Sequence, residues 1–95
     1  MDCKEIRWSG HSLRRMFQRR LDRLHVLTVL HTGERIEDYP DDTPYPSFLL
    51  LGFFGNRPLH VVAAVDSDRG VCYIVTVYEP DLEKWEPGFK VRRSS

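Results

Sequence analysis

Two short turn sequences divide the second half of the chain into runs rich in β-branched and aromatic residues, and this alternation limits the fold more than any other feature. Gly55-Asn56-Arg57-Pro58 separates the runs 47–54 and 59–65, and the segment 66–70 separates 59–65 from 71–78. Such runs favour strands, and turns this short usually connect antiparallel neighbours. With a further run at 35–39, the sequence predicts a mainly antiparallel sheet of roughly four strands.

The first third of the chain predicts two helices. After a strand-like opening at 5–8, Ser9 is suited to cap a helix over about 10–20. Asp22 can cap a second helix that ends near Thr32, and Gly33 suits the left-handed position after its end. We therefore expect an α+β fold in which two N-terminal helices pack on one face of the sheet.

The first predicted helix has one apolar and one basic face. At about 100° per residue, its apolar face comprises Leu13, Met16, Phe17 and Leu21. The opposite face comprises His11, Arg14, Arg15, Gln18 and Arg19. The apolar face should pack on the sheet, which leaves the basic face for a ligand or for solvent alone.

Length and composition indicate a single domain. The chain has 95 residues with no repeat or long linker, so we assign residues 1–95 to one domain, with 81–95 as a C-terminal tail held by Trp85 and Phe89. The 14 basic and 14 acidic residues balance, which argues mildly against nucleic-acid binding, although arginines cluster early and Lys90, Arg92 and Arg93 cluster at the end.

Cysteine usage and hydropathy point to the cytoplasm. Cys3 and Cys72 are the only cysteines, and we expect no disulfide between them. The longest apolar run, 48–54, is far shorter than the ~20 residues that a membrane span needs, so no membrane association is expected. The four histidines and two cysteines lack the spacing of a metal site, and no cofactor-binding motif occurs, so we expect neither metal nor cofactor.

Residues suited to RNA cleavage could meet on the sheet and the first helix. A hairpin symmetric about Asp68 places His60 opposite Thr76, with Tyr78 on the same face. Metal-independent cleavage needs a base, an acid and cations around the phosphate. The two histidines of these elements, His11 and His60, are candidates for base and acid, and Tyr78 could donate a proton or stack on a base.

Plainer interpretations remain open for each of these residues, and Thr76 and Tyr78 could be ordinary strand residues. The arginines of the first helix could form an ordinary solvated face. His60 could be a hydrogen-bonded sheet residue, and His11 a solvated residue at a helix start.

An ordered set of short sequence motifs spans nearly the whole chain. They are Ile6-x-Trp-Ser-x-His11, Arg15-Met16, Gln18-Arg19, Gly33-Glu34, Ile36-Glu37-x-Tyr39-Pro40, Pro44-Tyr45-Pro46-Ser47, Arg57-Pro58-Leu59-His60-Val61-Val62, Ile74-x-Thr76-x-Tyr78-Glu79-Pro80-Asp81, Lys84-Trp85 and Arg92-Arg93. In these motifs the chain resembles domain-of-unknown-function family 4258, which is similar to the RelE/ParE/BrnT superfamily of toxin–antitoxin ribonucleases. The resemblance implies a two-helix, antiparallel-sheet fold of the RelE/BrnT kind.

The resemblance also implies a function. It favours a toxin-like, metal-independent endoribonuclease (an mRNA interferase) of a type II toxin–antitoxin pair, acting on single-stranded or ribosome-held mRNA. The catalytic candidates are His11, Arg15, Arg19, His60 and Tyr78, and the RNA-binding candidates are Arg14, Thr76, Trp85, Lys90, Arg92 and Arg93. The expected partner is a cognate antitoxin, with a zinc-ribbon protein of the MqsA kind as one candidate. The alternative is a non-catalytic protein-binding module of the same fold.

Overall fold

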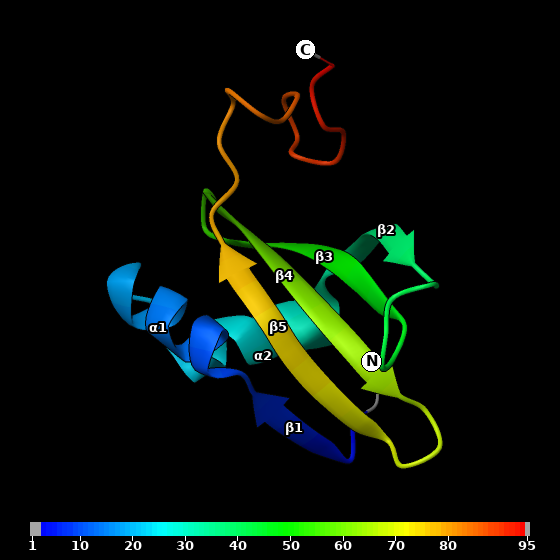
Figure 1. The fold of residues 1–95 in the computed structure, drawn as a ribbon. Coiled ribbons are helices and arrows are strands. Elements are labelled where there is room, and N and C mark those ends of the chain that lie inside the picture. The colour runs from blue at the N-terminus through cyan, green and yellow to red at the C-terminus, as the bar shows by residue number, and fades with distance from the viewer. Residues whose placement is uncertain (1–2, 95) are drawn as a thin grey trace.

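The computed structural model describes residues 3–94 (Figure 1). The elements follow in the order β1 (Glu5–Trp8), α1 (Gly10–Gln18), α2 (Arg23–Thr32), β2 (Glu34–Tyr39), β3 (Ser47–Phe54), β4 (Arg57–Asp66) and β5 (Val71–Tyr78). The outermost residues of the predicted domain, 1, 2 and 95, lie outside this described part. The predicted α+β class and the two N-terminal helices are confirmed.

The prediction of a roughly four-stranded, mainly antiparallel sheet is wrong, because the sheet is mixed and contains a fifth strand. Its order is β1-β5-β4-β3-β2. The pairs β2/β3, β3/β4 and β4/β5 are antiparallel as expected, but β1 pairs in parallel with β5, from Glu5 opposite Val71 to Trp8 opposite Ile74. A parallel pair cannot be joined by a short turn, so no local turn signal marks β1 as part of the sheet.

The parallel pairing of β1 also brings the two cysteines together. Cys3 and Cys72 form a disulfide, with 5.7 Å between their Cα atoms and a sequence separation of 69. The expectation of two free thiols is therefore wrong. A pairing over this separation depends on the position of β1, which the sequence alone did not reveal.

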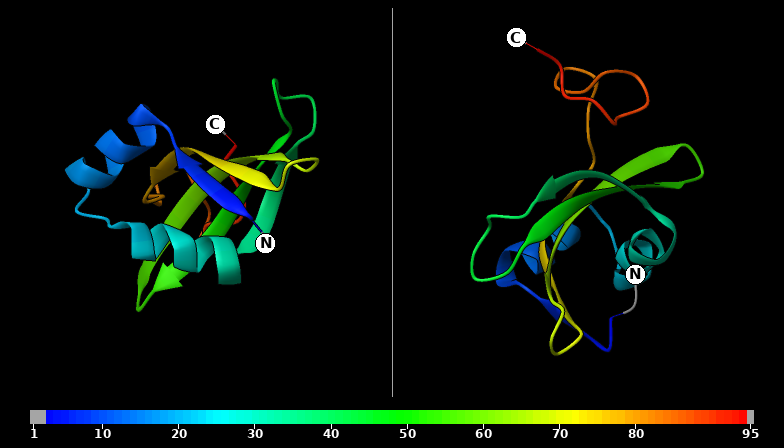
Figure 2. Two further views of the ribbon diagram at one scale, coloured as in Figure 1. Left: turned by 90° about the horizontal axis from the view of Figure 1, so that it is seen from below. Right: turned by 90° about the vertical axis from the view of Figure 1, so that its right-hand side faces the viewer.

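The core lies between the helices and one face of the sheet. Val26 and Val29 of α2 are almost fully buried against that face, together with Val61, Ile74 and Val77 from the strands. Figure 2 shows the helices on one side of the sheet and the C-terminal segment on the other. The second face is therefore the one that the tail partly covers.

Both helices begin at the predicted caps. The Ser9 side chain accepts a hydrogen bond from the Ser12 backbone N–H at 3.0 Å. The Asp22 carboxylate accepts from the His25 backbone N–H, and the His25 ring accepts from the Asp22 backbone N–H, both at 3.1 Å. Each cap satisfies backbone N–H groups that have no partner within the helix, and this fixes where each helix starts.

Two details of the helices differ from the prediction. Phe17, assigned to the buried face of α1, is 86% exposed, whereas Met16 is 4% exposed. Gly33 has φ −70° and is not left-handed. A Cβ at this position would lie 2.5 Å from the Val29 carbonyl oxygen, so glycine permits a close approach of the backbone where α2 passes directly into β2.

The hairpin of β4 and β5 has a different register from the one predicted. His60 pairs with Tyr78, and Val62 pairs with Thr76, because the register shifts between Val62 and Ala63. Val75 is the extra residue on β5, as expected for a β-bulge. The observed partner lies two residues beyond the predicted one, so His60, Thr76 and Tyr78 still share one face of the sheet.

No helix among residues 3–94 is long and apolar enough to span a membrane.

Candidate functional site

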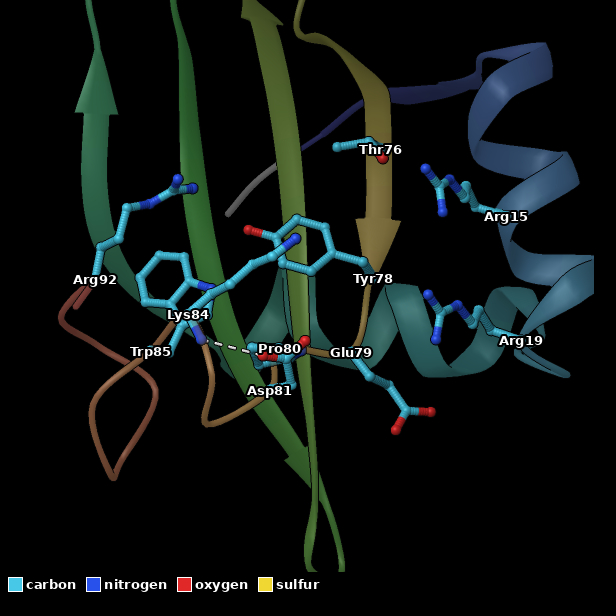
Figure 3. Close-up of a pocket in the computed structure, with 10 residues that line it drawn as sticks. All are labelled: Arg15, Arg19, Thr76, Tyr78, Glu79, Pro80, Asp81, Lys84, Trp85 and Arg92. Carbon is cyan, nitrogen blue, oxygen red and sulfur yellow. Dashed lines mark hydrogen bonds between the residues drawn. The ribbon is translucent and has the colours of Figure 1, made fainter. Parts of the chain in front are cut away.

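A cleft of about 310 Å³ opens between α1, the end of β5 and the C-terminal tail (Figure 3). We call it the cationic cleft. It is lined by Arg15 and Arg19 of α1, Thr76, Tyr78 and Glu79 at the end of β5, and Pro80, Asp81, Lys84, Trp85 and Arg92 of the tail. Figure 3 shows Tyr78 between the two arginines of α1 and the tail residues.

The α1 side of the cleft depends on helix geometry and on the Ser9 cap. Arg15 and Arg19 are four residues apart, so their side chains lie on one helix face. The Ser9 hydroxyl also donates to the Val75 carbonyl oxygen at 3.1 Å, which ties the start of α1 to the bulge of β5. The helix is therefore held at β5 with both arginines beside Thr76 and Tyr78 (Figure 3).

The tail side of the cleft is an ordered turn structure anchored by one tryptophan. The Asp81 carboxylate accepts hydrogen bonds from the backbone N–H groups of Glu83 and Lys84, at 3.0 and 3.1 Å. Trp85 is 2% exposed and forms an isolated β-bridge with Arg92, whose guanidinium carbon lies 5.2 Å from the centre of the indole ring. Burial of Trp85 thus holds Arg92 at the cleft.

The acidic residues of the cleft have other partners. Glu79 forms an ion pair with Arg57, and Asp81 caps the turn described above. Within residues 3–94, no ion pair involves any of the four basic residues of the cleft: Arg15, Arg19, Lys84 and Arg92. The four basic side chains outnumber the two acidic ones that line the cleft, and an anion bound between them would reduce the repulsion among these like charges.

His60 lies directly beneath Tyr78 and is fully buried. Its Nδ1 lies 3.1 Å from the Tyr78 hydroxyl oxygen, and its Nε2 lies 2.8 Å from the carbonyl oxygen of Phe89 in the tail. The Trp85 ring packs edge-on against the imidazole, with 4.5 Å between the ring centres. His60 therefore joins β4, β5 and the tail, and Tyr78 and Trp85 lie between it and the cleft.

Burial favours the neutral forms of both rings. It lowers the pKa of His60 below its ordinary value, an effect that the hydrogen bond to the Phe89 carbonyl partly opposes. Burial also raises the pKa of Tyr78, while the nearby Arg92 acts in the opposite direction. Near pH 7 the pair is thus a neutral imidazole and a neutral phenol.

The structure brings together six of the eleven predicted site residues. Arg15, Arg19, Thr76, Tyr78, Trp85 and Arg92 line the cleft, and His60 lies beneath it. Four do not line it: His11, Arg14, Lys90 and Arg93. Lys90 instead pairs with Glu34 at 3.0 Å, and Arg93 pairs with Glu86 at 3.2 Å. His11 and Arg14 are exposed on α1.

Sequence reasoning missed four residues that line the cleft. They are Glu79, Pro80, Asp81 and Lys84. Lys84 could have been found, because it precedes the tryptophan that we had assigned to RNA contact. Among residues 3–94, no group of three or more histidine, cysteine, aspartate or glutamate side chains is placed to hold a metal ion.

The fold and the cleft define a small α+β domain with a mixed five-stranded sheet and a cationic cleft on the face opposite its core. The chain belongs to the family described as Domain of unknown function (DUF4258), which it matches over residues 8–79. No significant match was found among curated proteins or among solved structures. The family match includes α1 and β5 but ends before Lys84, Trp85 and Arg92, so the tail side of the cleft lies beyond the matched residues.

Proposed function

We propose that this protein binds single-stranded RNA in the cationic cleft and cleaves it without a metal ion, as a toxin-like endoribonuclease. The observation that carries the proposal is the convergence of four basic side chains, none of which forms an ion pair within residues 3–94, around the Tyr78 phenol. Arginine forms paired hydrogen bonds with phosphate oxygens, and cations stabilise the extra negative charge of a pentacoordinate phosphorane. The balanced net charge of the chain does not oppose local binding, because the basic side chains that line the cleft outnumber its two acidic ones.

The proposed reaction is an internal displacement at phosphorus. The ribose 2′-oxygen attacks the phosphorus and loses its proton, the bond to the 5′-oxygen breaks, and that oxygen takes up a proton. The products are a 2′,3′-cyclic phosphate and a 5′-hydroxyl end. Arg15 and Arg19 would hold the phosphate. Tyr78 would take the 2′-hydroxyl proton as its own proton passes to Nδ1 of His60, and the Lys84 ammonium would supply a proton to the leaving oxygen.

The proposed nuclease function implies a family of related toxins and an inhibitory partner. We infer a relationship to the RelE/ParE/BrnT toxins, with mRNA, free or ribosome-held, as the substrate and the cytoplasm as the place of action. A cognate antitoxin, for which a zinc-ribbon protein of the MqsA kind is one candidate, would inhibit by presenting acidic groups to the cleft, since these would replace phosphate between the same arginines.

Binding to a fluorescein-labelled single-stranded RNA, measured by anisotropy, tests the first half of the proposal. Affinity should fall with increasing salt, with a slope of about −0.7 per phosphate contact on a single strand. Arg15→Ala and Arg19→Ala should each weaken binding and flatten this slope. Arg14→Ala is the matched control, because it removes the same charge from α1 outside the cleft. Equal losses in Arg14→Ala and Arg15→Ala would refute binding in the cleft.

Cleavage is tested on the same RNA in the presence of EDTA. Gel electrophoresis should show fragments that end in cyclic phosphate with the wild type, and none with a Tyr78→Phe variant that still binds. Intact RNA with a folded, RNA-binding wild type would refute the nuclease and leave an RNA-binding protein.

One observation favours the second candidate, a protein-binding module. Leu13 and Phe17 lie one turn apart on α1 and are 39% and 86% exposed, and large exposed apolar side chains are typical of contact surfaces. We would co-purify the chain with the protein encoded beside it. If the wild type binds that protein without binding RNA, and Phe17→Ser abolishes the complex, the module is the better assignment.

A further inference from the structure

The hydrogen bonds of His60 determine which of its nitrogens carries the proton. The Phe89 carbonyl oxygen can only accept a hydrogen bond, and it lies 2.8 Å from Nε2, so Nε2 must be the protonated nitrogen. Burial keeps the ring neutral, which leaves Nδ1 with a lone pair and no hydrogen. Nδ1 therefore accepts the hydrogen bond that joins it to the Tyr78 hydroxyl at 3.1 Å.

This arrangement fixes the direction of the Tyr78 hydroxyl. A phenol has one proton, and here that proton points inward to His60. The lone pairs of the oxygen remain for a ligand, and no other hydrogen bond from residues 3–94 involves this hydroxyl. Toward the cleft, Tyr78 can therefore accept a hydrogen bond but cannot donate one.

We propose that His60 is a positioning residue that makes Tyr78 an acceptor toward the cleft, so that the cleft selects a ligand with a hydroxyl donor beside its phosphate. In a nucleic acid strand that donor is the 2′-hydroxyl of ribose, which DNA lacks. The inference rests on the proposed binding of a phosphodiester by the basic residues of the cleft. The inference adds the ribose 2′-hydroxyl as the group by which the cleft distinguishes RNA from DNA.

The C-terminal tail helps to fix the direction of the Tyr78 proton. The carbonyl of Phe89 sets the tautomer, and Trp85 covers the imidazole and excludes water from it. Without the tail, water could bond to Nε2 as donor or acceptor, and the direction of the Tyr78 proton would no longer be fixed. The segment that supplies Lys84 and Arg92 to the cleft thus also sets its hydrogen-bonding preference.

The test compares two strands of one sequence, an RNA and its 2′-fluoro analogue, which has no 2′ donor. Binding is measured by anisotropy with EDTA present, and each sample is run on a gel so that only intact RNA is compared. The wild type should bind RNA roughly fivefold more tightly per bound 2′-hydroxyl, the value of one ordinary hydrogen bond. Tyr78→Phe should bind both strands equally.

A second variant separates positioning from folding. His60→Gln keeps an amide N–H for the Phe89 carbonyl but has no acceptor at the Nδ1 position, so the Tyr78 proton can turn toward the cleft. It should lose the preference for RNA while still binding both strands. Tyr45→Phe is the control, since it removes a tyrosine hydroxyl outside the cleft, and it should keep the wild-type ratio.

The ring nitrogens can also be observed directly. In ¹⁵N spectra of the imidazoles, the shifts of His60 should identify Nε2 as protonated and Nδ1 as unprotonated. Protonation at Nδ1 would overturn the inference whatever the binding data show.

The outcomes separate this inference from the function on which it rests. Equal wild-type binding of the two strands, or a preference that survives in Tyr78→Phe, would overturn the inference and leave strand binding in place. Failure of the folded wild type to bind either strand would overturn both.

Discussion

Breaking the disulfide between Cys3 and Cys72 should cost this domain a large part of its stability. The bond closes a loop across a sequence separation of 69. In the chain-entropy treatment, a loop of this length corresponds to about 4 kcal/mol of lost freedom in the unfolded chain. A domain of this size typically has a free energy of unfolding of roughly 5–14 kcal/mol. The four-residue edge strand β1 should be affected first, because it is joined to the sheet only through β5.

The measurement is urea unfolding, followed by circular dichroism, of the oxidised protein, the protein reduced with a phosphine, and the Cys3→Ser/Cys72→Ser double variant. The two forms without the bond should agree with each other and lie about 4 kcal/mol below the oxidised form. At roughly 4–8 °C per kcal/mol, the thermal midpoint should fall by about 15–30 °C.

Two results would refute this reasoning. The first is reaction of two thiols per chain in the folded, unreduced protein, which would mean that the bond does not form. The second is an equal free energy of unfolding with and without the bond. The thiol measurement also bears on the proposed cytoplasmic location, because disulfides rarely persist in that compartment.

Three further predictions concern stability and can be checked by the same unfolding experiment. Trp85→Ala removes a side chain that is 2% exposed and should cost about 3–5 kcal/mol. Gly52→Ala places a Cβ 2.6 Å from Cγ2 of Val29 and should cost roughly 1–3 kcal/mol by displacing α2; no loss would show that α2 has room to move. Burial lowers the pKa of His60, so below pH ~6.5 the unfolded chain takes up a proton at His60 before the folded chain does. This contribution to stability is complete above that pH and is lost as the pH falls, at up to about 1.4 kcal/mol per unit, and this slope should be absent in His60→Gln.

Local chemistry predicted most of the secondary structure. Both helix caps form as expected, and the predicted strands at 47–54 and 71–78 have the observed bounds. The tight turns between β3, β4 and β5 correctly indicated antiparallel neighbours. These features succeed because each depends on residues a few positions apart.

The errors concern relations between distant parts of the chain. The parallel pairing of β1 with β5 and the disulfide depend on where the N-terminus lies relative to a strand near the other end. The bulge at Val75 changed the partner of His60 from the predicted Thr76 to Tyr78, and the sequence around Val75 gives no sign of this bulge. Phe17 was assigned to the core because a period of 3.6 defines a face but not the width of the surface that the sheet covers.

The residues of the candidate site were predicted better than their arrangement in space. The arginine face of α1 and the sheet face with Tyr78 were identified from spacing, but the sequence could not tell which arginines face β5. His60 was identified as a candidate acid or base in contact with substrate, whereas the structure places it beneath Tyr78, with both nitrogens bonded within the protein. The His60 ring is buried because the tail packs on it. Phe89, the tail residue that bonds the ring, lies 29 residues further along the chain.

The tail connects the stability of the domain to the occupancy of the cleft. Arg15, Arg19 and Tyr78 belong to the body of the domain, whereas Lys84 and Arg92 reach the cleft only because Trp85 is buried on His60. With no anion bound, Lys84 and Arg92 of the tail are repelled by Arg15 and Arg19 of α1, and a bound phosphate would offset this repulsion. A ligand that binds only when the tail is packed on His60 stabilises that packing, by about 2.7 kcal/mol at a concentration of one hundred times its dissociation constant. Ligand binding should therefore protect the tail amides from hydrogen exchange more than those of α2, which packs on the opposite face of the sheet and contributes nothing to the cleft.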